Sequence, residues 1–167
     1  HNNENGCAWM EKGKSGTRTV LSNTGRRRLN IISALNALKL ETETFITEAN
    51  CNKELILLFL ESLRDKHPPE VKIYLVMDNA GYNRAYEVQE YAEQNNIQLL
   101  YLPPYSPNLN IIERLWKFFK KKIMKNKYYA EFVDFENAVI SFFQNIGNYE
   151  DELFELLALK FEIIKAN

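Results

Sequence analysis

Asp78 and Glu113 are the acidic residues whose positions suggest chemistry. Asp78 ends the apolar run VKIYLVMD, which has the continuous hydrophobicity of a strand buried on both faces. Glu113 comes after 34 intervening residues, at the start of a basic amphipathic segment that follows the run IQLLYLP. Ligands of open α/β sheets bind in the crevice beyond the carboxyl ends of the strands. We therefore expect strands at 71–78 and 97–103 to end at one edge, where the two carboxylates converge and share a metal ion.

Each acid also has a purely structural interpretation. Asp78, in the sequence DNAG, could close its strand as an Asx turn or a helix cap. Glu113 could complete a capping box with Asn110 and suit the positive end of the helix dipole. It could also pair with Lys117 one turn later, which would stabilise the helix by about 0.2–0.5 kcal/mol. The residues alone leave these alternatives open.

The elements that would position the two acids follow from hydrophobic periodicity. Strands are predicted at 7–13, 28–38 and 42–49, followed by a helix at 52–67 that Asn52 caps. A strand at 71–78, a helix at 83–94, a strand at 97–103 and a helix at 110–125 come next. Two more helices, near 132–145 and 151–164, form a tail from about residue 128. This order predicts an α/β fold with a mixed sheet.

The composition is that of an ordinary soluble domain. The chain has 167 residues, 46% of them apolar and 26% charged, which fits one domain with a real core. Cys7 and Cys51 are too few for a disulfide framework or a zinc site, so a reducing cytoplasm is expected. No apolar segment is long enough to cross a bilayer. His67, before two prolines at a helix end, is predicted to be a solvated cap.

Charge is distributed unevenly along the chain although the net charge is only -1. Residues 9–39 hold seven Lys or Arg against Glu11, and residues 101–127 hold seven against Glu113. Residues 128–167 hold eight acids against two lysines. This pattern indicates a basic face, for which DNA is a natural partner. The candidate DNA contacts are Arg26, Arg27, Arg28, Lys117, Lys120 and Lys121, although such clusters are also common on solvated surfaces.

Two segments, LVMDNAGYNRA and IQLLYLPPYSPNLNIIERLWKFFKKKI, resemble the catalytic region of insertion-sequence transposases of the mariner superfamily. These are DDE enzymes with a ribonuclease-H-like fold. The similarity extends back through CAWMEKGKSG and SNTGRRRLNIISALNA and covers most of the chain up to about Lys125. The resemblance implies three antiparallel strands followed by parallel strands, flanked by helices, in a single domain over residues 1–167. It also implies that Asp78 is the second catalytic Asp and Glu113 the final Glu, with Pro103, Pro104 and Pro107 fixing the approach of Glu113.

The chain departs from the family pattern in three places. The family's first catalytic Asp lies on a strand upstream of the CAWMEKG segment, so we expect this chain to start just after that strand. Glu4 and Glu11 are nearby acids, but neither lies in a strand of the right character. The family tends to carry His a few residues after the second Asp, where this chain has Asn83. We also expect the helix-turn-helix that usually recognises transposon ends to lie outside this segment.

The resemblance implies a DNA transposase that hydrolyses phosphodiester bonds and performs strand transfer at transposon ends. Mg²⁺ or Mn²⁺ is the expected cofactor, held by Asp78 and Glu113 without a His or Cys cluster. The expected partner is DNA, as transposon end and target, in a bacterial cytoplasm and on the nucleoid when bound. A homodimer is compatible with this, but the sequence does not decide the oligomeric state. The alternatives are a DNA-binding remnant that has lost its chemistry and another ribonuclease-H-like nuclease, such as a resolvase.

Overall fold

The structure is a computed structural model that describes residues 27–36, 38–103 and 110–157. The described strands are β1 (Asn30–Asn36), β2 (Glu41–Thr47), β3 (Ile73–Met77) and β4 (Ile97–Tyr101). The described α-helices are α1 (Lys53–Asp65), α2 (Tyr86–Gln94), α3 (Ile112–Phe119), α4 (Phe132–Gln144) and α5 (Glu150–Leu157). Their order confirms the predicted α/β class.

The described strands pair in two separate sheets of two strands each. β1 and β2 form an antiparallel hairpin, with Ser33 opposite Thr44 and their hydroxyls 2.8 Å apart. β3 and β4 are parallel, with Met77 opposite Tyr101. The parallel pairing confirms that the strands before Asp78 and before residue 103 end at the same edge. The first expected strand, at 7–13, lies outside the described residues, and no ladder joins the hairpin to the parallel pair within them.

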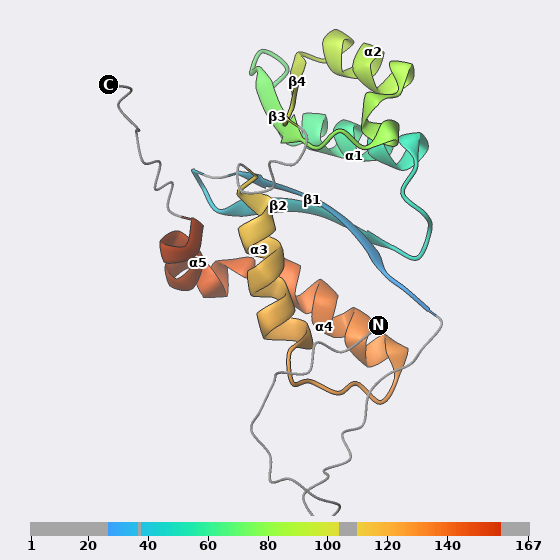
Figure 1. The fold of residues 1–167 in the computed structure, drawn as a ribbon. Coiled ribbons are helices and arrows are strands. Elements are labelled where there is room, and N and C mark those ends of the chain that lie inside the picture. The colour runs from blue at the N-terminus through green and yellow to red at the C-terminus, as the bar shows by residue number, and fades with distance from the viewer. Residues whose placement is uncertain (1–26, 37, 104–109, 158–167) are drawn as a thin grey trace, which may run out of the picture.

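One hydrophobic core lies between the hairpin and the C-terminal helices, on the side of the hairpin where α3, α4 and α5 gather in Figure 1. We call it the helical core. The aromatic rings of α3 and α4 dominate it, with Phe119 stacked on Phe143 at 5.5 Å between ring centroids. Its buried residues are Leu115, Phe118, Phe119, Ile123, Phe135, Val139, Phe142, Phe143, Ile146, Leu153 and Leu157.

A second, smaller core lies between α1, α2 and the parallel strands, and we call it the sheet core. Its buried residues are all aliphatic: Ile56, Leu60, Val88, Ala92 and Ile97. Asn52 caps α1, as predicted, and its side-chain oxygen accepts the Leu55 N–H at 2.9 Å. α2 ends at Gln94 and is followed by Asn96, which has the left-handed φ of 56° that is common after a helix.

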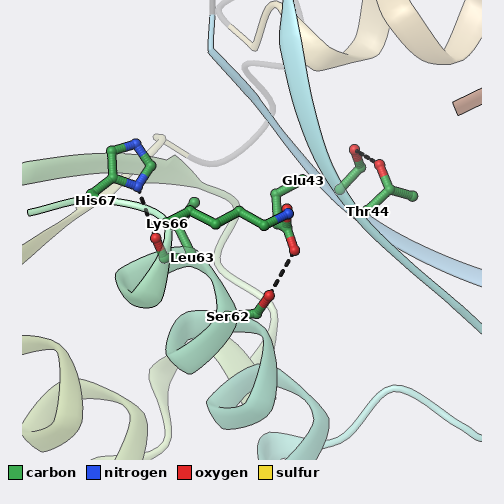
Figure 2. A network of polar contacts seen from close by, with 7 residues as sticks. Glu43, Thr44, Ser62, Leu63, Lys66 and His67 are labelled. Atoms are coloured by element: carbon green, nitrogen blue, oxygen red, sulfur yellow. Dashed lines mark hydrogen bonds and ion pairs between the residues drawn. The ribbon is translucent and has the colours of Figure 1, made fainter. Parts of the chain in front are cut away.

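Arg64, which is 8% exposed, ties the ends of α1 and α2 together. Its Nη1 donates to the carbonyls of Val71 and Asn95, each at 3.0 Å, and its Nη2 donates to the carbonyl of Pro68 at 2.7 Å. His67 closes the same end of α1 through a ring nitrogen 2.8 Å from the Leu63 carbonyl (Figure 2). His67 therefore acts as a helix cap, as predicted.

The hairpin also contacts α1, which links the two cores. The Phe45 and Phe59 rings meet edge to face with centroids 5.4 Å apart. Figure 2 shows a polar contact between β2 and α1, in which the Glu43 carboxylate accepts the Ser62 hydroxyl at 2.7 Å and pairs with Lys66. The Glu43 side chain is only 9% exposed. This contact joins β2 of the helical core to α1 of the sheet core.

Three predicted helices differ in detail. The helix expected at 83–94 is divided into a 3-10 turn, η2 (Gly81–Arg84), and α2. The helix expected at 110–125 begins as α3 and widens into a π-turn, η4 (Lys120–Met124), where the Lys125 N–H bonds the Lys120 carbonyl at 2.9 Å. A 3-10 turn, η5 (Ile146–Tyr149), leads directly into α5. The rest of the helix expected at 151–164 lies outside the described residues.

Candidate active site

Asp78 directly follows β3 and is exposed. Its Oδ1 accepts the Ala80 N–H at 3.0 Å, which is the Asx turn that the sequence allowed. The same oxygen accepts Nδ2 of Asn83 at 2.8 Å. An ionised carboxylate has four lone-pair sites, so these two bonds leave Oδ2 open to a further ligand. The structural role of Asp78 therefore leaves it able to bind a cation.

The loop after Asp78 is anchored to the neighbouring strand. The Leu102 N–H donates to the Met77 carbonyl at 3.0 Å, and the Asn79 side-chain amide donates to the Leu102 carbonyl. Asp78 therefore lies beside the point where β4 ends. The chain leaves this point toward α3 through residues 104–109, where Pro104 and Pro107 lie outside the described residues.

Glu113 lies in the first turn of α3 and is exposed. Asn110 precedes the N-cap residue Ile111, and its side-chain oxygen accepts the Ile112 N–H at 3.3 Å in a local turn. The return half of a capping box, from Glu113 to the Asn110 N–H, is not formed, and Lys117 does not pair with Glu113 among the described residues. The carboxylate is therefore not occupied by either structural role considered from the sequence.

Tyr82 is the aromatic neighbour of Asp78 in this loop. Burial raises the pKa of its hydroxyl, and the negative charge of Asp78 raises it further, with a smaller contribution from Cys51. The phenol therefore senses the charge on Asp78. Neither Tyr82 nor the hydrogen bond from Asn83 to Asp78 was predicted from the sequence.

The basic residues proposed as DNA contacts divide into two groups. In the first group, Arg27 pairs with Glu48, and its guanidinium lies 4.1 Å from the centre of the Phe132 ring. Arg28 donates a hydrogen bond to the side chain of Asn50. Arg26 lies outside the described residues. Lys117, Lys120 and Lys121 are all exposed on the α3–η4 segment. Lys122, on the same segment, pairs with Glu152 at 2.7 Å.

Exposed carboxylate oxygens are the ligands that Mg²⁺ prefers. Asp78, after a strand, and Glu113, in the first turn of a helix, therefore stay the predicted metal ligands. Among the described residues, no three His, Cys, Asp or Glu side chains gather closely enough to hold a metal ion. No helix in the same ranges is long and apolar enough to cross a membrane.

The fold is similar to that of transposases. The Mos1 transposase paired-end complex with the left transposon end matches 94% of this chain and 51% of its own, with a TM-score of 0.64 at 14% identity. The Mos1 mariner paired-end complex with Mn matches 97% and 53%, with a TM-score of 0.65 at 14% identity. The chain thus spans about half the length of these transposases, and its fold is the ribonuclease-H-like fold of their catalytic cores.

Sequence comparison gives the family. The uncharacterized protein y4pE/y4sA of Sinorhizobium fredii is 32% identical over 60 residues, which are 36% of this chain and 42% of that protein. A family model described as the DDE superfamily endonuclease matches residues 1–136, which include both Asp78 and Glu113. The chain belongs to the DDE superfamily endonucleases.

Proposed function

We propose that this chain is the catalytic part of a DNA transposase that uses Mg²⁺ or Mn²⁺ to cut phosphodiester bonds and to join the freed end to another strand. The observation that most supports this function is the placement of Asp78 at the shared end of two parallel strands, with no partner for Oδ2 among the described residues. The similar Mos1 structures include complexes with a transposon end and with Mn, which agrees with the proposed partner and cofactor.

In this proposal Asp78 and Glu113 supply two of the metal ligands. Two divalent ions about 3.5–4 Å apart can activate an attacking oxygen and stabilise a leaving oxygen in displacement at phosphorus. Hydrogen bonds from Ala80 and Asn83 hold Asp78 in place. Glu113 is held by α3, which packs in the helical core. A third carboxylate would come from outside the described residues.

Paramagnetic line broadening by Mn²⁺ tests the shared site. We expect NMR signals around Asp78 and Glu113 to broaden together as Mn²⁺ is added to the 167-residue chain. Asp78→Ala should abolish the effect at both places. Asp65→Ala should not, because Asp65 is an exposed acid at the far end of α1. Broadening near only one of the two acids, or broadening that survives Asp78→Ala, would contradict the proposal.

Activity should depend on the third ligand. We expect Mg²⁺-dependent nicking of supercoiled DNA by the 167-residue chain to be weak if Asp78 and Glu113 are its only metal ligands. The reason is that a metal site with two ligands misplaces the attacking group, and small misplacements cost large factors in rate. Strong nicking, abolished by Asp78→Ala, would show that a third carboxylate completes the site or is not needed.

Binding to DNA without catalysis is the second candidate function. It is favoured by the absence of a three-ligand cluster among the described residues and by the exposed lysines of the α3–η4 segment. We expect Lys117→Ala with Lys121→Ala to reduce the salt dependence of DNA binding by about 0.9 per lost phosphate contact, or roughly 1.8 in all. Lys122→Ala is the matched control, because Glu152 engages that lysine. Equal slopes for the two variants would mean that the exposed pair does not contact DNA.

A further inference from the structure

We infer that Asn83 is a positioning residue for Asp78, because its side-chain amide makes Oδ2 the one oxygen that faces the cation. The inference rests on the proposed function, which gives Asp78 a cation to bind. Asn83 is 7% exposed, and Arg64 is the only other polar or charged residue that is buried within the described ranges. A buried amide needs a hydrogen-bond partner, and the partner of Nδ2 is Asp78 Oδ1 at 2.8 Å.

The two oxygens of Asp78 are made unequal by this contact. Oδ1 accepts both Asn83 Nδ2 and the Ala80 N–H, at 2.8 and 3.0 Å, and two bonds use both of its lone pairs. The χ1 torsion of an Asp side chain can occupy several staggered wells, and its χ2 torsion is broad with no strong preference of its own. With the Ala80 N–H alone, both torsions could change and move the free oxygen. The second donor removes that freedom and leaves Oδ2 as a single ligand atom.

Asn83 is itself held from two sides. Its N–H donates to the Ala80 carbonyl at 3.0 Å within the η2 turn, and its carbonyl accepts the Tyr101 hydroxyl at 2.8 Å. Tyr101 is the register partner of Met77, the residue before Asp78, and the Arg84 guanidinium lies 5.1 Å from the Tyr101 ring centre. These contacts join the end of β3 to β4 through the η2 turn. The position of the two strands therefore determines where the Asn83 amide holds the Asp78 carboxylate.

The alternative is that Asn83 only stabilises the turn. Removing Asn83 would then lower the stability of the loop without changing the orientation of Asp78 or its affinity for a cation. A positioning residue would alter both, and a replacement that restores the donor would recover both. Histidine is such a replacement, because its Nδ1 is bonded to Cγ just as Nδ2 of asparagine is.

The experiment compares Asn83→Ala, Asn83→His and the control Asn95→Ala in the 167-residue chain. Asn95 is a partly buried asparagine whose Nδ2 donates at 2.8 Å to the Tyr91 carbonyl rather than to Asp78. The first measurement is the χ1 rotamer of Asp78 without metal, from three-bond NMR couplings to its β protons. The second is the apparent Kd for Mn²⁺, from broadening of signals near Asp78.

We expect one Asp78 rotamer in the wild type and in Asn95→Ala, and averaged rotamers in Asn83→Ala. The affinity for Mn²⁺ should fall about 10–100-fold in Asn83→Ala, as is typical when a contact that orients a metal ligand is lost, and should be largely recovered in Asn83→His. An unchanged rotamer or an unchanged affinity in Asn83→Ala would overturn the inference. Failure of the wild type to bind Mn²⁺ would instead contradict the proposed function, while the rotamer measurement would still decide the role of Asn83.

Discussion

The helical core and the sheet core are built at different scales. The helical core contains eleven buried residues, five of them phenylalanines, and it includes α3 with Glu113. The sheet core contains five buried aliphatic residues and carries Asp78 at the end of β3. The two acids of the candidate site thus belong to different cores. Their separation is therefore set by whatever links those cores, and not by either core alone.

The link is the hairpin. β1 directs Ile31 toward the helical core and Ile32 toward the sheet core, as expected for neighbouring residues on opposite faces of a strand. β2 adds the Phe45–Phe59 contact. It also adds the Glu43 carboxylate, whose side chain is 9% exposed (Figure 2). We expect the smaller core to open more readily, because local stability follows the amount of buried apolar contact.

The largest expected effect comes from removing a ring of the helical core. Phe142→Ala should reduce the free energy of unfolding by about 3–5 kcal/mol, because Phe142 is 2% exposed and contacts Phe118, Phe119 and Phe143. Urea unfolding followed by circular dichroism measures the loss.

The matched change in the sheet core is Leu60→Ala, expected to cost about 2–5 kcal/mol at a fully buried position. Hydrogen exchange should then accelerate in β3 and β4 while α4 stays protected. Equal acceleration throughout the chain would show that the two cores unfold as one and would remove the distinction.

A middle-sized effect is expected at the link. Glu43→Gln keeps the size of the side chain and an acceptor for Ser62 but loses the charge that pairs with Lys66. Lys66 is 61% exposed, so screening limits the expected loss to about 0.5–1 kcal/mol. Hydrogen exchange in α1 should increase more than for Glu48→Gln, whose partner Arg27 lies away from α1. A larger effect of Glu48→Gln would place the link elsewhere.

The smallest expected effect is electrostatic. It is a change in the pKa of a tyrosine, compared between one tyrosine from each region. Burial raises the pKa of both Tyr82 and Tyr129, but only Tyr82 also has a raising contribution from Asp78. Asp78→Asn removes that charge, so the pKa of Tyr82 should fall while staying above its ordinary value, and the pKa of Tyr129 should not change. Tyrosine NMR signals followed through an alkaline titration measure both. A shift of both tyrosines together would indicate a general change in structure.

The sequence predicted the parts of the fold that local pattern determines. The continuous apolar runs before Asp78 and before Pro103 are parallel strands, and Asn52 caps α1. The π-turn at Lys120–Met124 was not predicted, because a helical pattern of apolar residues does not reveal a local widening. The Asn83 contact was missed because it depends on a 3-10 turn and on Tyr101 from another strand. The ion pair of Arg27 with Glu48 likewise joins residues that only the folded hairpin brings together.

Arg64 restricts how the sequence can vary. Its guanidinium is buried without a carboxylate partner among the described residues, and its charge is offset by three carbonyl dipoles near the ends of α1 and α2. Helix C-termini carry partial negative charge, so one cation serves both. Lysine keeps the charge but concentrates it at one nitrogen, which cannot replace a planar fork that reaches carbonyls on both sides. The exchange of Arg for Lys is neutral on most surfaces. At position 64 we expect it to be excluded in homologues that retain this contact between the ends of α1 and α2.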